Sequence, residues 1–253
     1  MEKDVKKALD DIDSVNPFAT YLSDSTLSRV GGWIDTGSYV LNAIVSGSIH
    51  GGIPKGRVTM LAGESMTGKS LFVMKILAAA QKEGIIPVIF DTENAIDPEG
   101  AERLGLDVSN VKYVPCISIE QTRNALYKFL TSVKEKGLEG KFIVAIDSLG
   151  NLQSELSLAR MGKDSTSTDM GTNARAMKSL MQTCTNLGAV TQTTILCTNH
   201  VYDNPAALFP SIEKNMPGGK SCVYLPSVTI QLARKPVKSD GGKTMDAETA
   251  VAQ

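Results

Sequence analysis

From residue 58 onward, short apolar runs alternate with longer segments whose apolar positions recur at helical spacing. Each run has the length and the β-branched content of a buried strand. The runs lie at residues 58–62, 85–90, 111–114, 142–146, 194–198 and 228–232. Strands that alternate with helices predict parallel βαβ units. We therefore expect an α/β fold with a mostly parallel, twisted sheet flanked by helices.

Helices are expected between these runs. Residues 70–82 and 173–187 place apolar side chains at helical spacing, and Asp97 and Ser118 are positioned as N-caps of two further helices. Two segments interrupt the alternation. Residues 154–172 are polar, and residues 202–221 carry three prolines and a Gly-Gly pair. Because each follows a core strand or its exit, both are expected as mobile loops near the carboxyl edge of the sheet.

Length and composition predict one large domain. The chain has 253 residues, of which 42% are hydrophobic and 21% charged, as in an ordinary globular protein. Residues 1–30 are expected to form an N-terminal arm with a helix over residues 4–12, and residues 31–253 the core. The formal net charge of −1 argues against a globally basic nucleic-acid binder but leaves room for local basic patches.

The same composition bears on location and metals. The N-terminus is charged, and no apolar run approaches the ~20 residues of a membrane span, so we expect a cytoplasmic protein with no membrane partner. The four cysteines stand singly and there are two histidines, which predicts reduced buried thiols and no zinc site.

A phosphate-binding motif follows the first strand. Residues 63–70 read Gly-Glu-Ser-Met-Thr-Gly-Lys-Ser, a complete G-x-x-x-x-G-K-[ST] loop between a strand and a helix. Gly63 and Gly68 let backbone N–H groups turn toward phosphate oxygens; Lys69 is expected on the β- and γ-phosphates and Ser70 on Mg²⁺. A glycine-rich turn is the alternative, but the motif predicts a nucleoside triphosphatase. The remaining loop positions expected to touch the nucleotide are Glu64, Ser65, Met66 and Thr67.

Two carboxylates are expected beside this loop. Asp147 ends an apolar strand and is the candidate to hold Mg²⁺ next to Ser70; its alternative role is an N-cap. Glu93 lies just past residues 85–90, so a parallel sheet brings it to the same edge, where it would orient and deprotonate a water molecule. A solvated surface glutamate is the alternative for Glu93.

These motifs resemble the RecA family of recombinases, and within it the phage UvsX branch. The matching stretches are residues 36–44, 51–58, 63–70, 90–98, 146–152, 174–180 and 198–200, in the family's order, and the likeness extends over about residues 31–235. The resemblance implies a RecA-like P-loop NTPase core, with ATP and Mg²⁺ as cofactors. It also implies an ATP-dependent recombinase that binds single-stranded DNA (ssDNA) and exchanges strands as a homo-oligomeric helical filament, with an ssDNA-binding protein and a loader protein as further partners.

The resemblance also implies roles for particular residues. The polar stretch near residues 160–170 would be the first DNA-binding loop and residues 202–221 the second. His200, after Asn199, is similar to the family's γ-phosphate sensor, which makes it a candidate catalytic residue with Lys69 and Glu93; a partly buried structural histidine is the alternative. The candidate DNA contacts, with solvated loop charges as the alternative for the lysines, are Arg160, Lys163, Phe209, Lys214 and Lys220.

The chain departs from the family pattern in two places. Gly100 stands where the family usually has an aromatic residue that stacks on adenine, which leaves adenine selectivity open. By the resemblance we also expect the sequence to stop before the family's basic strand pair and C-terminal domain, as a truncated core would. Two rival hypotheses stay open: a hexameric helicase or clock-type ATPase on the same fold, and a non-catalytic ATP- and DNA-binding fragment that regulates a full-length recombinase.

Overall fold

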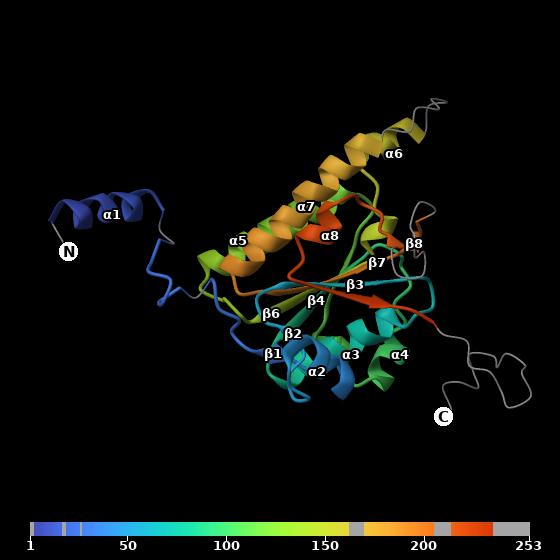
Figure 1. Ribbon diagram of the computed structural model, residues 1–253. Coiled ribbons are helices and arrows are strands. Elements are labelled where there is room, and N and C mark those ends of the chain that lie inside the picture. Colours follow the sequence, from blue (N-terminus) through green and yellow to red (C-terminus); the bar gives the residue numbers. More distant parts are fainter. Residues whose placement is uncertain (1–2, 17–18, 26, 162–169, 205–213, 235–253) are drawn as a thin grey trace, which may run out of the picture.

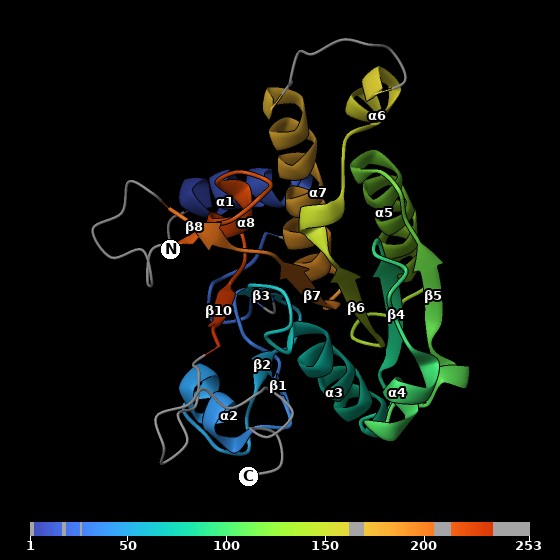
Figure 2. The ribbon, with the colours of Figure 1, turned by 90° about the vertical axis from the view of Figure 1, so that its right-hand side faces the viewer.

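The described residues form a six-stranded parallel sheet with helices on both faces. The computed structural model describes residues 3–16, 19–25, 27–161, 170–204 and 214–234. The strands are ordered β10-β3-β7-β6-β4-β5 across the sheet, and every neighbouring pair runs parallel (Figure 2). Their bounds are β3 (Val58–Gly63), β4 (Ile86–Asp91), β5 (Lys112–Pro115), β6 (Phe142–Asp147), β7 (Thr194–Asn199) and β10 (Val228–Leu232). The predicted α/β class is confirmed.

Side chains on the central strands alternate between two apolar cores, one on each face of the sheet. In β6, Val144 and Ile146 enter one core while Ile143 and Ala145 enter the other, as the two-residue period of a strand requires. The first core lies under α5 (Ile119–Glu135), α7 (Met170–Val190) and α8 (Ser221–Tyr224). The second lies under α2 (Tyr39–Ser46), α3 (Lys69–Lys82) and α4 (Pro98–Arg103), on the opposite side (Figure 1).

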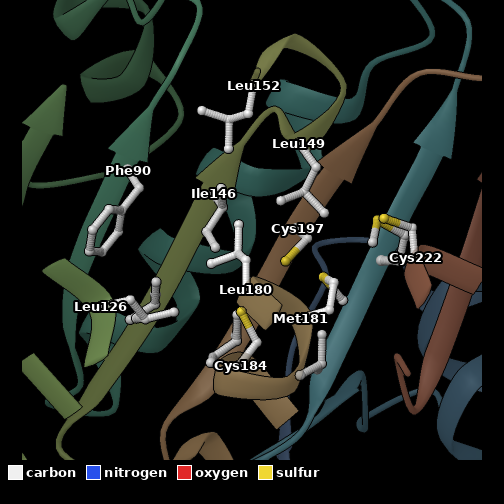
Figure 3. Close-up of a cluster of buried hydrophobic side chains, with 14 of the residues drawn as sticks. Phe90, Leu126, Ile146, Leu149, Leu152, Leu180, Met181, Cys184, Cys197 and Cys222 are labelled. Carbon is white, nitrogen blue, oxygen red and sulfur yellow. The ribbon is translucent and has the colours of Figure 1, made fainter. Parts of the chain in front are cut away.

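The first core joins the sheet to its two longest helices. Leu126 of α5 and Leu180 of α7 are completely buried against the strands (Figure 3). Burial of each such side chain contributes about 1.5–3 kcal/mol. All four cysteines, Cys116, Cys184, Cys197 and Cys222, lie in the same cluster and are buried and free, as expected for reduced thiols.

The predicted loop over residues 154–172 is partly helical, so that expectation was wrong. Residues Glu155–Met161 form α6, and α7 already begins at Met170. The hydroxyl of Ser154 accepts a hydrogen bond from the N–H of Ser157 (3.2 Å), which caps the start of α6, and the sequence Glu-Leu-Ser-Leu-Ala-Arg-Met that follows is rich in helix-forming residues. Residues 162–169 lie outside the described part of the chain.

Several short elements complete the structure. The expected helix at residues 4–12 is observed as the longer α1 (Lys3–Val15), which lies to one side of the layered body (Figure 1). Helix α2 and the antiparallel pair formed by β1 (Trp33–Ile34) and β2 (Ile53–Pro54) were not predicted. The remaining elements are the 3₁₀ turns η1 (Val108–Asn110) and η2 (Leu149–Asn151) and the strands β8 (Tyr202–Asp203) and β9 (Lys214–Asn215).

Candidate functional site

The loop between β3 and α3 needs glycine at both ends. A Cβ atom on Gly63 would lie 2.6 Å from Oγ1 of Thr67 and 2.8 Å from the carbonyl oxygen of Leu232, so a side chain does not fit there. Gly68 has a φ angle of 88°, in the left-handed region that glycine adopts without strain. These two positions let the chain turn tightly from a buried strand into the N-terminus of a helix, where free N–H groups favour anions.

Lys69 is folded back onto this loop. Its Nζ atom donates hydrogen bonds to the carbonyl oxygens of Gly63 (2.9 Å) and Glu64 (2.8 Å), and the residue is 7% exposed. Burial lowers the pKa of Lys69, while the charges of Asp147 and Glu93 act in the opposite direction. An ammonium group held by two carbonyl oxygens can transfer these bonds to phosphate oxygens without moving far.

Asp147 and Ser70 present hard oxygen ligands side by side. The Ser70 hydroxyl donates a hydrogen bond to Oδ2 of Asp147 (2.9 Å), and the Thr198 hydroxyl donates one to Oδ1. Burial raises the pKa of Asp147, which the two hydroxyl bonds oppose and the charges of Glu93 and Asp91 reinforce. A cation between these oxygens would favour the ionised carboxylate, so the pair suits a divalent ion such as Mg²⁺.

Glu93 is oriented by two neighbours that bind the same oxygen. The Ser148 hydroxyl donates a hydrogen bond to Oε1 of Glu93 (2.6 Å), and Nε2 of His200 lies 3.2 Å from that atom. Burial raises the pKa of Glu93, but the hydrogen bonds from Ser148 and His200 and the charges of His200 and Lys69 outweigh it, so the net pKa is lowered. Glu93 is therefore held as a carboxylate near neutral pH.

The structure brings these side chains around one cavity of about 270 Å³. Its lining residues are Ser65, Met66, Gly68, Lys69, Ser70, Leu71, Glu93, Asp147 and His200. They come from the carboxyl ends of four adjacent strands, in the order β3, β7, β6 and β4. This geometry agrees with the expectation that five side chains meet at one edge of the sheet: Lys69, Ser70, Glu93, Asp147 and His200.

A second cavity of about 240 Å³ adjoins the first and shares Ser70, Leu71, Glu93 and Asp147 with it. It is also lined by Gly100 of α4, by Leu104 just after that helix and by Met74 of α3. A Cβ atom on Gly100 would lie 2.7 Å from Oδ2 of Asp97, whose carboxylate caps this helix through the N–H groups of residues 99 and 100. The chain thus offers a mostly apolar space beside the phosphate-binding loop.

Comparison with known proteins connects this geometry to a family. The profile of the RecA N-terminal domain matches residues 3–252. The chain belongs to the RecA family. It is 32% identical over 222 residues to protein RecA of Chlorobium chlorochromatii, which covers 86% of this chain and 58% of that protein. Protein RecA of Rubrobacter xylanophilus is 28% identical over 258 residues (99% and 71%), and that of Aquifex aeolicus is 27% identical over 210 residues (83% and 57%).

This RecA-family chain therefore spans a little over half the length of several relatives that it matches, including the first and the last of the three above. The closer likeness to the UvsX branch stays a prediction. Within the described residues, no helix is long and apolar enough to cross a membrane.

Three of the residues predicted to contact DNA lie in the described part of the chain. Arg160 lies in the last turn of α6, Lys220 is exposed just before α8, and Lys214 lies in β9. Lys163 and Phe209 fall outside the described residues. Lys214 does not extend into solvent: it binds Asp203 and Glu64, a contact with the phosphate-binding loop that sequence reasoning did not foresee.

Sequence reasoning also missed Asp91, which shapes the turn that carries Glu93. Asp91 is 1% exposed, and its Oδ1 accepts hydrogen bonds from the N–H groups of Glu93 and Asn94, both 2.9 Å. Its Oδ2 accepts a hydrogen bond from the hydroxyl of Tyr113 (3.1 Å). An aspartate at a strand end, two residues before the expected base, was the available signal, because short Asp side chains bind backbone N–H groups in this way.

Proposed function

We propose that this RecA-family chain is the ATP-hydrolysing, ssDNA-binding core of a strand-exchange recombinase that acts in homologous recombination and in recombination-dependent repair and replication as a helical filament. One observation carries the proposal: Lys69, Ser70, Glu93, Asp147 and His200 line a single cavity at the carboxyl edge of the sheet. This set combines a phosphate cradle, a pair of metal ligands, a carboxylate base and a residue that begins the chain segment leading to β8.

The cradle fits the triphosphate of ATP. Lys69 and the N–H groups at the start of α3 supply positive charge and donors for phosphate oxygens. Ser70 and Asp147 would hold Mg²⁺, whose charge stabilises the transferred phosphoryl group when it is bound. The adjoining cavity between α3 and α4 would hold the nucleobase of ATP. Because its lining is mostly apolar, the nucleobase would be held there by apolar contacts.

Glu93 is the group that would orient the attacking water and accept its proton. Among the described residues, both hydrogen bonds recorded for its carboxylate go to Oε1, so Oε2 is the atom left to face a water molecule. The lowered pKa keeps Glu93 ionised, and the bonds from Ser148 and His200 fix its direction. Positioning of this kind supports general-base catalysis.

His200 would couple the state of the nucleotide to DNA. Its imidazole contacts Glu93, and its backbone N–H donates a hydrogen bond to Oδ1 of Asn199 (2.9 Å). The amide of Asn199 in turn donates a hydrogen bond to the carbonyl oxygen of Pro217 (3.0 Å). A change at Glu93 on phosphate cleavage would therefore reach residues 202–221, the segment proposed to bind DNA, at two places: next to His200 and at Pro217.

The decisive test is ATP hydrolysis with and without ssDNA, in the unaltered chain and in Lys69→Ala. We expect hydrolysis that ssDNA stimulates and that the substitution abolishes. No nucleotide binding by the unaltered chain would refute the proposal at its base, and hydrolysis indifferent to DNA would refute the recombinase part. ATP binding without turnover would favour the non-catalytic fragment, while closed rings in electron micrographs would favour the helicase-type or clock-type assembly.

A further inference from the structure

Lys214 connects two parts of the chain that are 150 residues apart. It lies in β9, which pairs antiparallel with β8 so that Lys214 is opposite Asp203; each strand has two residues, and the pair is called the β8–β9 hairpin below. Its Nζ atom donates hydrogen bonds to Asp203 and to Oε1 of Glu64, the latter over 3.2 Å. The Lys214 side chain is only 13% exposed. Its ammonium is therefore held between the hairpin and the phosphate-binding loop.

Glu64 contacts both lysines of this region. Its carbonyl oxygen accepts a hydrogen bond from Lys69 (2.8 Å), and its carboxylate binds Lys214. A phosphate group that takes over Lys69 removes the first of these contacts. The backbone of Glu64 is then released on the side that faces the nucleotide, while its side chain still binds the hairpin. Glu64 is thus the residue through which a change in the loop reaches Lys214.

The same segment has a second, separate attachment. His200 contacts Glu93 at the end of β4, and Asn199 binds the carbonyl oxygen of Pro217. The hairpin is therefore attached to two different carboxylates, to Glu93 by way of His200 and to Glu64 by way of Lys214. No residue is shared between the two attachments, so each can be broken while the other is kept.

We propose that Glu64, Lys214 and Asp203 form an ion-paired link that transmits the state of the phosphate-binding loop to the β8–β9 hairpin, with Lys214 as a positioning residue. The presence of the link does not depend on the function proposed above, whereas its effect on DNA-stimulated hydrolysis does. The hydrogen bonds from Lys214 to Asp203 and Glu64 raise the pKa of Lys214, which keeps it charged.

The link is tested first without nucleotide, by hydrogen–deuterium exchange at the amides of residues 202–203 and 214–215 in the full chain. Glu64→Gln and Asp203→Asn are expected to speed this exchange about two- to fivefold, the range for loss of one partly exposed ion pair. Lys214→Arg should keep the slow exchange of the unaltered chain, because it keeps the charge. Glu83→Gln is the matched control, since it breaks the surface pair Lys55–Glu83 away from the site.

The coupling is tested by steady-state ATP hydrolysis with and without a poly-dT oligonucleotide. We expect the ratio of stimulated to basal kcat to fall about threefold or more in Glu64→Gln and in Lys214→Gln, with no further fall in the double variant, because both remove the same contact. Asp203→Asn should also lower the ratio, because it removes the other ionic partner of Lys214. Lys214→Arg should keep the ratio of the unaltered chain.

The outcomes separate the two proposals. Unchanged hairpin exchange in Glu64→Gln overturns the link, whatever the chain does with ATP. Losses that multiply in the double variant overturn the coupling. A loss confined to Lys214→Gln, with the salt dependence of DNA binding weakened by about one phosphate contact, shows that Lys214 binds DNA directly instead. An unaltered chain that never hydrolyses ATP overturns the proposed function, while the exchange experiment still decides the link.

Discussion

The Ser148 hydroxyl donates a hydrogen bond to Oε1 of Glu93 over 2.6 Å, from the residue that directly follows Asp147. Ser148 is itself fixed, because its N–H and carbonyl oxygen both bond the Thr92 hydroxyl, at 2.9 and 2.8 Å. These hydrogen bonds join the ends of β4 and β6. They thereby hold the proposed base, Glu93, at a fixed position relative to the proposed metal ligand, Asp147.

Ser148→Ala is expected to lower the kcat for ATP hydrolysis about tenfold with little change in KM. The variant removes one hydrogen bond to a charged group, worth about 1.5–3 kcal/mol, and leaves Glu93 less well directed and with a higher pKa. Steady-state kinetics measure this. In a Glu93→Gln background the same substitution should add almost nothing; an equal loss there would mean that Ser148 acts on something other than Glu93.

His200→Ala is expected to reduce stimulation of hydrolysis by ssDNA at least fivefold while nucleotide affinity changes little, because the side chain joins Glu93 to the segment proposed to bind DNA. Fluorescent-nucleotide binding and ATPase assays with and without ssDNA measure the two effects. His50 is the other histidine of the chain and is exposed, so His50→Ala is the matched control. Full stimulation in His200→Ala would contradict the coupling role.

The four cysteines are expected to resist a disulfide reagent such as DTNB at pH 8 until the chain unfolds. Burial raises the pKa of Cys222 to about 12 and also raises that of Cys116, while a hydrogen bond with Cys184, followed by burial, raises that of Cys197. The reactive thiolate of these three residues is therefore scarce, and all four thiols are buried. Four thiols should react in denaturant. Ser48→Cys, at an exposed position, should add one fast thiol to the native chain; a fast thiol without it would contradict the prediction.

Asp35 is expected to give the chain a small stability that disappears in acid. The hydrogen bond from Asn42 (2.7 Å) is the main cause that lowers the pKa of Asp35, helped by the N–H of Gly37 and opposed by burial. A lowered folded-state pKa stabilises the protein above the unfolded value near 3.9, and this stabilisation is lost as the pH falls through the folded-state pKa. Because Asp35 is exposed, the effect is below about 1 kcal/mol.

Urea unfolding of the unaltered chain and of Asp35→Asn measures this effect. The stability difference between them should be present at pH 6 and shrink at pH 3. A difference that stays constant or grows toward acid would show that the charge of Asp35 is not its cause.

The sheet was predictable from sequence because buried parallel strands are continuous apolar runs, and β3 and β6 each begin within the expected range and end one residue beyond it. Helix α2 was not foreseen: its first turn follows Gly37, and what holds it is the buried side chain of Asn42, which bonds Asp35 and the N–H of Thr36. Such contacts depend on the fold and leave no local pattern.

The candidate site also has a part that the sequence predicts and a part that it does not. Lys69, Ser70 and Asp147 were found because motif and strand end place them at one edge of the sheet. The contacts of Ser148 with Glu93, Thr198 with Asp147 and Lys214 with Glu64 join residues 51–150 positions apart, so no spacing could predict them. The DNA contact predicted for Lys214 stays a prediction, and its ionic partners came only from the three-dimensional structure.

The order of the strands in the sheet has a consequence for how the chain folds during its synthesis on the ribosome. β7 lies between β3 and β6, although it is the last of the three to be synthesised. Until residue 199 has emerged, β3 has neither of its sheet neighbours, and the two halves of the cavity cannot be joined. A nascent chain that already carries the whole phosphate-binding loop should therefore bind no nucleotide, and its unpaired strand edges would be the surfaces that a chaperone has to cover.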